Sequence, residues 1–194
     1  MFELSKPEKY EIHCYLHGDI ILKHQFPNEF NDINNLLEGF EIYKSWIVKG
    51  GGGRSLVSKN IDSYLINDCG WEKKTFHTSI KVDGVSKENP THEIDCYKNR
   101  IAFETEWNNK TEFYDRDLNN FRILHQLGAI SLGVIITRSF ESLDKKLDEY
   151  EIKKKYGGST TRGDKLIKKI NGGGAGGCPV IAILMNGECV NEAK

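Results

Sequence analysis

The stretch HEIDCYKNRIAFETEW, residues 92–107, decides how this chain is interpreted. Its second half, residues 100–107, alternates in polarity as a β-strand does. This alternation places Glu104 and Glu106 on one face of the strand, opposite a face of bulky apolar side chains. Asp95 precedes Glu104 by nine residues and begins the preceding extended segment. We therefore expect a hairpin on which three carboxylates converge.

The composition is typical of one soluble globular domain. The chain has 194 residues, of which 38% are hydrophobic and 28% are charged, so we predict a single domain over residues 1–194. No apolar run is long enough to cross a bilayer, and the first residues lack the layout of a signal peptide, so we expect a cytoplasmic protein. Five widely spaced cysteines show no zinc-site spacing and are expected to be reduced and mostly buried. The net charge of −1 does not by itself indicate nucleic-acid binding.

The flanking segments predict an α/β fold with a central mixed β-sheet flanked by helices. The predicted strands are 10–16, 75–82, 100–107, 132–137 and 179–185. The predicted helices are 26–40, 55–70, 115–127, 143–155 and 164–170, with turns at 17–19 and before residue 92. Asn28 is a candidate helix cap and Gly39 a candidate helix end. The continuous apolar run at 132–137 indicates a strand covered on both faces.

The residue types in the hairpin suit phosphodiester cleavage. Asp95, Glu104 and the backbone carbonyl of Thr105 could hold Mg²⁺, which prefers oxygen ligands, and Glu106 could serve as the acid or base. In the alternative interpretation, the two glutamates form the wet face of an edge strand. The apolar face opposite them favours a strand inside the sheet, where an uncompensated acidic cluster would cost several kcal/mol. A bound metal ion would remove that cost.

The hairpin resembles a known family of nucleases. IDCYKNRIAFETEW, residues 94–107, is similar to the active-site hairpin of type II restriction endonucleases of the BglII, BstYI and BamHI group, within the PD-(D/E)xK nuclease fold. In that group Gln or Glu replaces the usual final Lys, and Glu106 matches the Glu form. Residues 15–39 and 176–184 resemble the first strand and helix and the closing strand of BstYI. The resemblance therefore covers most of the chain in order.

The resemblance implies Mg²⁺-dependent hydrolysis of double-stranded DNA by a homodimer at a short palindrome. Because the resembled enzymes read sites built around GATC, a GATC-centred site is the expectation. It implies that Asp95 and Glu104 bind the ion and that Glu106 positions or deprotonates the attacking water. Some relatives carry a further acidic or amide residue upstream. Asp83, Glu93 and the segment 78–79 all remain candidates for that role.

Candidate DNA contacts gather in three segments. Positive charge concentrates around the loop YGGSTTRG, residues 156–163, although Lys-rich segments are often only solvated helix faces. The predicted contacts there are Ser159, Thr160, Thr161, Arg162 and Lys165. Arg54 follows four glycines in a loop expected to be mobile, and Asn108, Asn109 and Lys110 follow the acidic strand directly. A disordered loop and an ordinary turn are the alternatives for these last two segments.

Two other functions fit the same residues less well. A repair or junction-resolving nuclease of this fold would read DNA shape instead of sequence. A non-catalytic DNA-binding module would keep the fold without metal chemistry. The presence of all three carboxylates together with an intact alternating strand argues against this second possibility.

Overall fold

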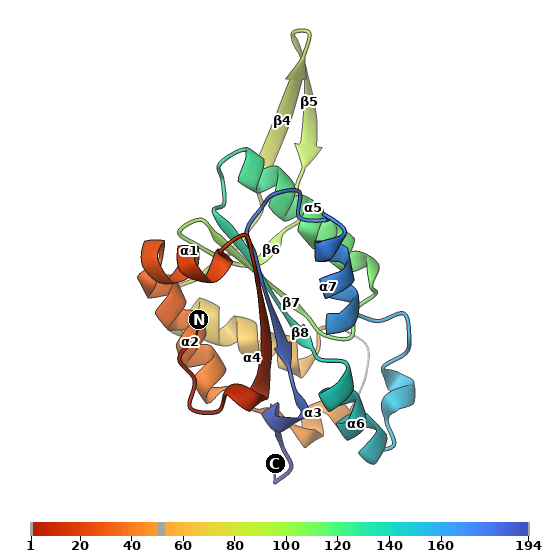
Figure 1. Cartoon of the computed structure of the whole chain (residues 1–194). Helices are drawn as coiled ribbons and strands as arrows, with labels where there is room; N and C mark the ends of the chain where they lie inside the picture. Colours follow the sequence, from red (N-terminus) through yellow and green to blue (C-terminus); the bar gives the residue numbers. More distant parts are fainter. Residues whose placement is uncertain (1, 50–52, 194) are drawn as a thin grey trace.

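The computed structural model describes residues 2–49 and 53–193, and its centre is a six-stranded sheet (Figure 1). The strands are β1 Tyr10–Tyr15, β3 Glu72–Lys74, β6 Ile94–Lys98, β7 Ile101–Glu106, β8 Leu132–Arg138 and β9 Val180–Met185. Their order is β1-β9-β8-β7-β6-β3. Strands β7, β8 and β9 run parallel, whereas β1, β6 and β3 pair antiparallel with their neighbours. The predicted mixed α/β sheet is confirmed.

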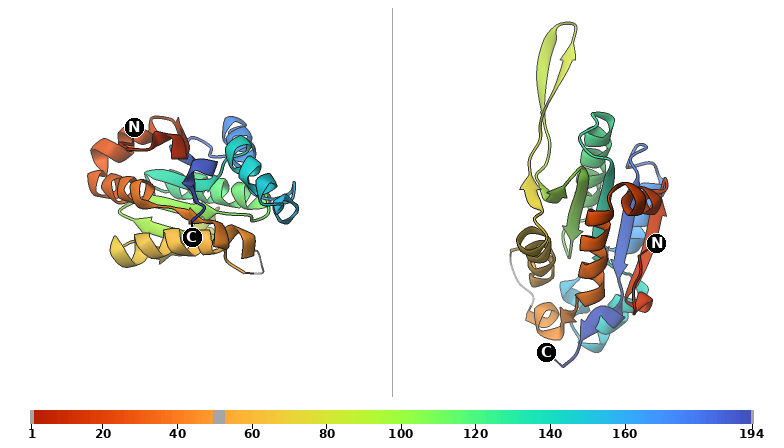
Figure 2. Two further views of the ribbon diagram at one scale, coloured as in Figure 1. Left: turned by 90° about the horizontal axis from the view of Figure 1, so that it is seen from below. Right: turned by 90° about the vertical axis from the view of Figure 1, so that its left-hand side faces the viewer.

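Helices cover both faces of this sheet (Figure 2). They are α1 Gly18–Gln25, α2 Pro27–Gly39, α3 Lys44–Lys49, α4 Leu56–Ser63, α5 Glu112–Gln126, α6 Glu141–Glu149 and α7 Gly163–Asn171. Side chains of α1, α2, α4 and α6 pack against the face that carries Ile101 and Phe103. Those of α5 and α7 pack against the opposite face, around Ala102. Strand β7 is therefore interior, and all six of its residues are buried.

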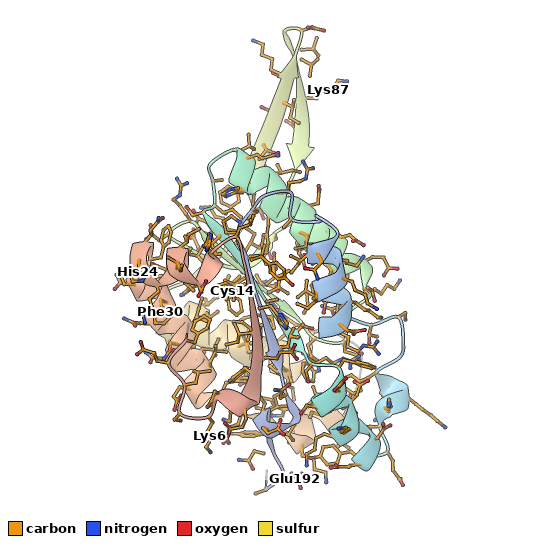
Figure 3. The ribbon with its side chains drawn as sticks, viewed as in Figure 1. Lys6, Cys14, His24, Phe30, Lys87 and Glu192 are labelled. Atoms are coloured by element: carbon orange, nitrogen blue, oxygen red, sulfur yellow. The ribbon has the colours of Figure 1, made fainter. Side chains whose placement is uncertain are left out.

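A long hairpin projects from one end of the body (Figure 1). It consists of β4 His77–Val82 and β5 Val85–Pro90, which pair with each other in a separate sheet. The turn at Asp83 and Gly84 has positive φ at both residues, the geometry that a tight hairpin requires. Lys87 extends from this projection (Figure 3). The predicted strand 75–82 thus forms, but it lies outside the central sheet, and the predicted turn at Pro90 is the end of β5.

Three further local predictions were wrong. Residues 17–19 are not only a turn, because α1 begins at Gly18. The helix α2 begins at Pro27, whose fixed φ suits the first helical position, so Asn28 does not cap it. The predicted helix 143–155 ends as α6 at Glu149 because Glu151 adopts a positive φ, and a 3₁₀ turn follows at Lys153–Lys155.

Other elements are as follows. Ser55 caps helix α4, because its hydroxyl accepts from the Ser58 amide, and the helix continues as a π-helical turn at Tyr64–Asp68. A second small sheet pairs β2 Ile42–Tyr43 with β10 Val190–Asn191. Short 3₁₀ turns lie at Pro7–Lys9 and Gly187–Cys189. All five cysteines are free thiols, and three are buried. Within the described residues, no helix combines the length and apolar character that a membrane crossing needs.

Candidate active site

The β6–β7 hairpin brings Asp95 and Glu104 side by side. Cys96 lies opposite Phe103 at the end of the antiparallel register, and Asp95 and Glu104 are the residues that follow this last pair on the two strands. The Asp95 amide donates to Glu104 Oε2 at 3.2 Å, and the Thr105 amide donates to Asp95 Oδ2 at 3.2 Å. The backbone of each strand thus orients the carboxylate of the other. Two of the three predicted carboxylates meet as the sequence pattern predicted.

Burial sets the electrostatics of these acids. The exposed fraction is 0% for Glu104 and 2% for the Glu106 side chain, against 23% for the Asp95 side chain. Burial raises the pKa of Glu104 well above its usual range and raises the pKa of Glu106 to about 9. Glu104 Oε1 has no hydrogen-bond partner among the described residues. A cation beside Glu104 and Glu106 would favour the ionised carboxylates, which burial otherwise disfavours.

Helix α5 supplies two groups that the sequence analysis missed. Arg116 donates through Nη2 to Glu106 Oε1 at 3.3 Å, and through Nε and Nη2 to Asp117 Oδ1 at 2.9 and 2.8 Å. Asp117 is fully buried, which raises its pKa to about 6. The sequence carried a signal for Asp117, because the residue lies three positions after Tyr114 and four before Phe121. This helical spacing places Asp117 on the same buried face of α5 as those two aromatic residues. A charged residue on the buried stripe of a helix requires a partner.

Helix α4 supplies a further missed acid from the other side of β7. Asp62 accepts from Thr105 Oγ1 at 2.9 Å and is buried, and burial followed by the nearby Asp95 raises its pKa to about 6. Arg54 Nη2 lies 2.8 Å from Asp95 Oδ1 and also contacts Asp62. The guanidinium therefore lies between two carboxylates. Of the predicted glycine loop, residues 50–52 lie outside the described residues.

The candidates for an upstream residue lie elsewhere. Asp83 and the segment 78–79 belong to the projecting hairpin, and Glu93 is exposed and paired with Lys73 at 3.3 Å. Asp62 is the upstream acid that the fold places beside Asp95. The sequence offered one sign of this role, because Asp62 follows Ile61 directly and both are buried positions of α4.

Two predicted DNA-contacting segments pair beside the end of β7. The Thr161 amide donates to the Asn109 carbonyl at 2.7 Å, and the Thr111 amide donates to the Ser159 carbonyl at 2.9 Å. An isolated β-bridge joins Lys110 with Thr160. The loop around residues 157–162 and the turn after β7 thus form one surface next to Glu106.

The side chains on this surface differ in their environment. Lys110 and Ser159 are exposed, whereas Thr161 is buried and its hydroxyl accepts from the Asn109 amide at 3.1 Å. Arg162 is paired with Asp164 at 2.5 and 2.9 Å.

The remaining residues predicted to contact DNA make hydrogen bonds within the protein. Thr160 Oγ1 accepts from buried Arg138, and the Lys165 ammonium contacts the Gly158 and Thr160 carbonyls. Asn109 Nδ2 donates to Glu106 Oε2 at 2.7 Å, and Asn108 Nδ2 donates to the Lys155 carbonyl at 3.2 Å. Their contact with DNA stays a prediction.

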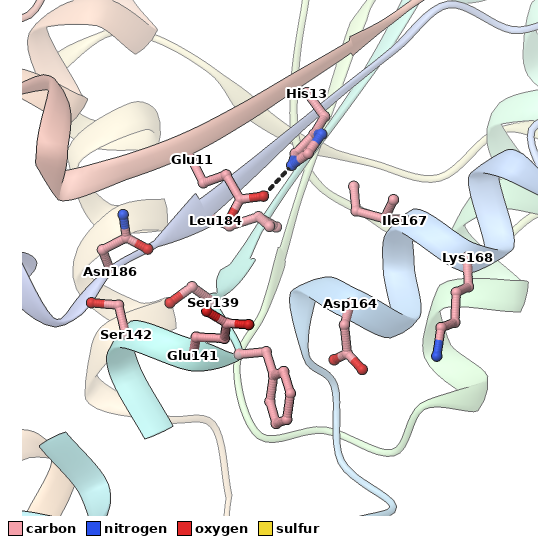
Figure 4. A pocket seen from close by; sticks show the side chains of 11 residues that line it. Glu11, His13, Ser139, Glu141, Ser142, Asp164, Ile167, Lys168, Leu184 and Asn186 are labelled. Carbon is pink, nitrogen blue, oxygen red and sulfur yellow. Dashed lines mark hydrogen bonds and ion pairs between the residues drawn. The ribbon is translucent and has the colours of Figure 1, made fainter. Parts of the chain in front are cut away.

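A surface pocket of about 600 Å³ lies apart from these acids (Figure 4). Its lining comes from β1, β9 and the first turns of α6 and α7 and includes Glu11, Glu141 and Asp164. Within this lining, His13 Nε2 and Glu11 Oε1 of β1 lie 2.5 Å apart. Three carboxylates outnumber the Lys168 ammonium and His13 on this lining, so the pocket suits the DNA backbone poorly.

Two comparisons bear on identity. A family model described as "Restriction endonuclease BglII/BglIII" matches residues 10–185, which is most of the chain. A search of curated proteins found none that matches.

Proposed function

This chain belongs to the BglII/BglIII family of restriction endonucleases, and we propose that it is a type II enzyme that hydrolyses double-stranded DNA at a short palindromic site. Membership in this family makes it a nuclease that acts on DNA. The observation that carries the finer proposal is the Asp95–Glu104 pair. A buried carboxylate oxygen without a protein partner, beside a partly exposed second carboxylate, is the arrangement that a hard divalent cation requires.

The donor set fits Mg²⁺. Asp95, Glu104 and the Thr105 carbonyl would hold the ion, and the Thr105 amide already points toward Asp95. When bound, Mg²⁺ would stabilise negative charge on the scissile phosphate and activate water. Glu106 would position or deprotonate the attacking water, while Asn109 and Arg116 fix its carboxylate. Asp62 is the upstream acid of this proposal.

The proposed DNA surface extends from the active site over the paired segments. Lys110 and Ser159 are exposed for phosphate or base contact, and Asn108, Thr160, Arg162 and Lys165 lie around them. Arg54 would turn from its carboxylate partners toward DNA. Thr161 and Asn109 would shape this surface through their mutual hydrogen bonds, in addition to any direct contact.

The proposed enzyme works as a homodimer in the cytoplasm. Two copies related by a two-fold axis would present two active sites to the two DNA strands, which explains a palindromic target. A GATC-centred hexamer is the specific site that we propose, from the family resemblance alone. Light scattering of the purified protein tests the dimer, and a monomer with full cleavage activity would contradict it.

Glu104→Ala tests the assignment of the active site. We expect loss of Mg²⁺-dependent cleavage with an unchanged circular dichroism spectrum, because the variant removes a metal ligand and no apolar contact. Glu149→Ala is the matched control, since Glu149 is exposed on α6. Cleavage by Glu104→Ala at the wild-type rate would overturn the assignment.

A further inference from the structure

A second group of possible metal ligands lies beside the Asp95–Glu104 pair, on the side of α5. His92, Glu104 and Asp117 each offer one ligand atom, and these atoms all lie within 4.8 Å of one another. The three residues come from the segment before β6, from β7 and from α5. Asn120 Nδ2 donates to the His92 carbonyl at 3.2 Å, which fastens the His92 segment to the same helix as Asp117.

The buried oxygens of this group need a partner. Glu104 and Asp117 are both 0% exposed. Glu104 Oε1 and Asp117 Oδ2 have no hydrogen-bond partner among the described residues. Arg116 donates to the other oxygen of Asp117 and to Glu106, so its guanidinium does not reach the two unpartnered oxygens by hydrogen bonds. Buried carboxylate oxygens without a hydrogen-bond partner are costly, and a metal ion would supply the partner that these two oxygens lack.

We propose that His92, Glu104 and Asp117 form a second divalent-cation site, which shares Glu104 with the Mg²⁺ pair. The span of the three ligand atoms is close to what one ion can bridge, because ligand distances are about 2.0–2.2 Å for such ions. A mixed set of one imidazole and two carboxylates favours ions such as Mn²⁺ over Mg²⁺ or Ca²⁺, which prefer oxygen alone. Asp95 does not belong to this site, so the two sites can be separated by mutation.

Occupation of this site explains the crowding of acids around β7. Glu104, Glu106 and Asp117 are three buried carboxylates, and the Arg116 guanidinium is shared by two of them. A divalent ion between His92, Glu104 and Asp117 offsets the remaining repulsion. The ion therefore also stabilises the contact of α5 with β7.

Mn²⁺ binding to the full chain without DNA tests this site. Calorimetry should give two Mn²⁺ ions per wild-type chain, and pulsed electron paramagnetic resonance should detect an imidazole nitrogen on one of them. His92→Ala should remove the nitrogen signal, and Asp117→Asn should weaken one of the two sites by about tenfold or more. Asp95→Asn should weaken the other site and keep the nitrogen signal. His125→Ala and Asp115→Asn are matched controls with unchanged binding, since they change the same residue types on α5.

Two results would overturn the inference. One is a wild-type chain that binds one Mn²⁺ without nitrogen coordination, and the other is a nitrogen signal that persists in His92→Ala. Neither result bears on the proposed function, which Mg²⁺-dependent DNA cleavage decides separately. If Asp117→Asn fails to fold, as circular dichroism would show, His92→Ala still decides the question because His92 is only half-buried.

Discussion

Replacing Glu106 by Gln should stabilise the metal-free protein increasingly as the pH rises. Burial, followed by the nearby Asp117 carboxylate, raises the pKa of Glu106 from 4.5 to about 9. Between these pH values the unfolded chain releases a proton that the folded chain keeps, so the wild-type protein loses stability as the pH rises. Glutamine has no proton to release, and its amide can still donate to a neighbouring carboxylate.

The size of the effect follows from the pKa of Glu106. Each pH unit between the unfolded and folded pKa values costs the wild type about 1.36 kcal/mol. From pH 4.5 to pH 7 the advantage of Glu106→Gln should therefore grow by about 3 kcal/mol, and it should continue to grow until about pH 9. This is a large part of the typical stability of a domain, which is about 5–15 kcal/mol.

Guanidinium denaturation followed by tryptophan fluorescence measures this difference. Both proteins are unfolded in EDTA at a series of pH values, and the variant is compared with the wild type at each one. Glu93→Gln, on an exposed surface, is the control and should show a nearly constant difference. A constant difference for Glu106→Gln as well would contradict this prediction, because Glu106 would then ionise alike in the folded and unfolded states.

Three other variants probe the packing and the site. Gly133→Ala should lower the free energy of unfolding by about 1–3 kcal/mol, because the new Cβ would lie 2.2 Å from the Phe121 ring. Gly39→Ala, with open space around it, is the control, and a Gly133→Ala protein as stable as the wild type would contradict this. Arg138→Ala should cost about 3–5 kcal/mol, because it removes the nearer cation of buried Asp144 and leaves Arg162 Nη1 at 3.9 Å, and it should speed proteolysis at 157–162; wild-type stability would contradict this. Arg54→Ala should tighten Mn²⁺ binding several-fold without DNA, because the guanidinium now lies between Asp62 and Asp95; unchanged affinity in a calorimetric titration would contradict this.

The alternation of β7 predicted its face and its place in the sheet. The apolar side chains of Ile101 and Phe103 predicted that the face opposite Glu104 is buried, and side chains of α2 and α4 pack against it. The pairing of Asp95 with Glu104 was also predictable, because a short hairpin fixes its own register.

What the sequence did not reveal depends on contacts between distant segments. Asp62 meets Thr105 across 43 residues, a contact that depends on where α4 docks. The pairing of Ser159 with Thr111 spans 48 residues and involves two irregular segments without periodicity. By contrast, Asp83-Gly84 is a strong turn signal that we did not use, and it would have predicted the projecting hairpin.

Metal-dependent cleavage of DNA at a specific sequence is the activity that we propose for this protein. Purified protein should be incubated with a methylation-free plasmid library, with and without Mg²⁺, and the resulting ends should be sequenced. We expect discrete Mg²⁺-dependent fragments with 5′-phosphate ends that share one palindrome. Random nicks, cutting confined to branched DNA, or no cutting would contradict it.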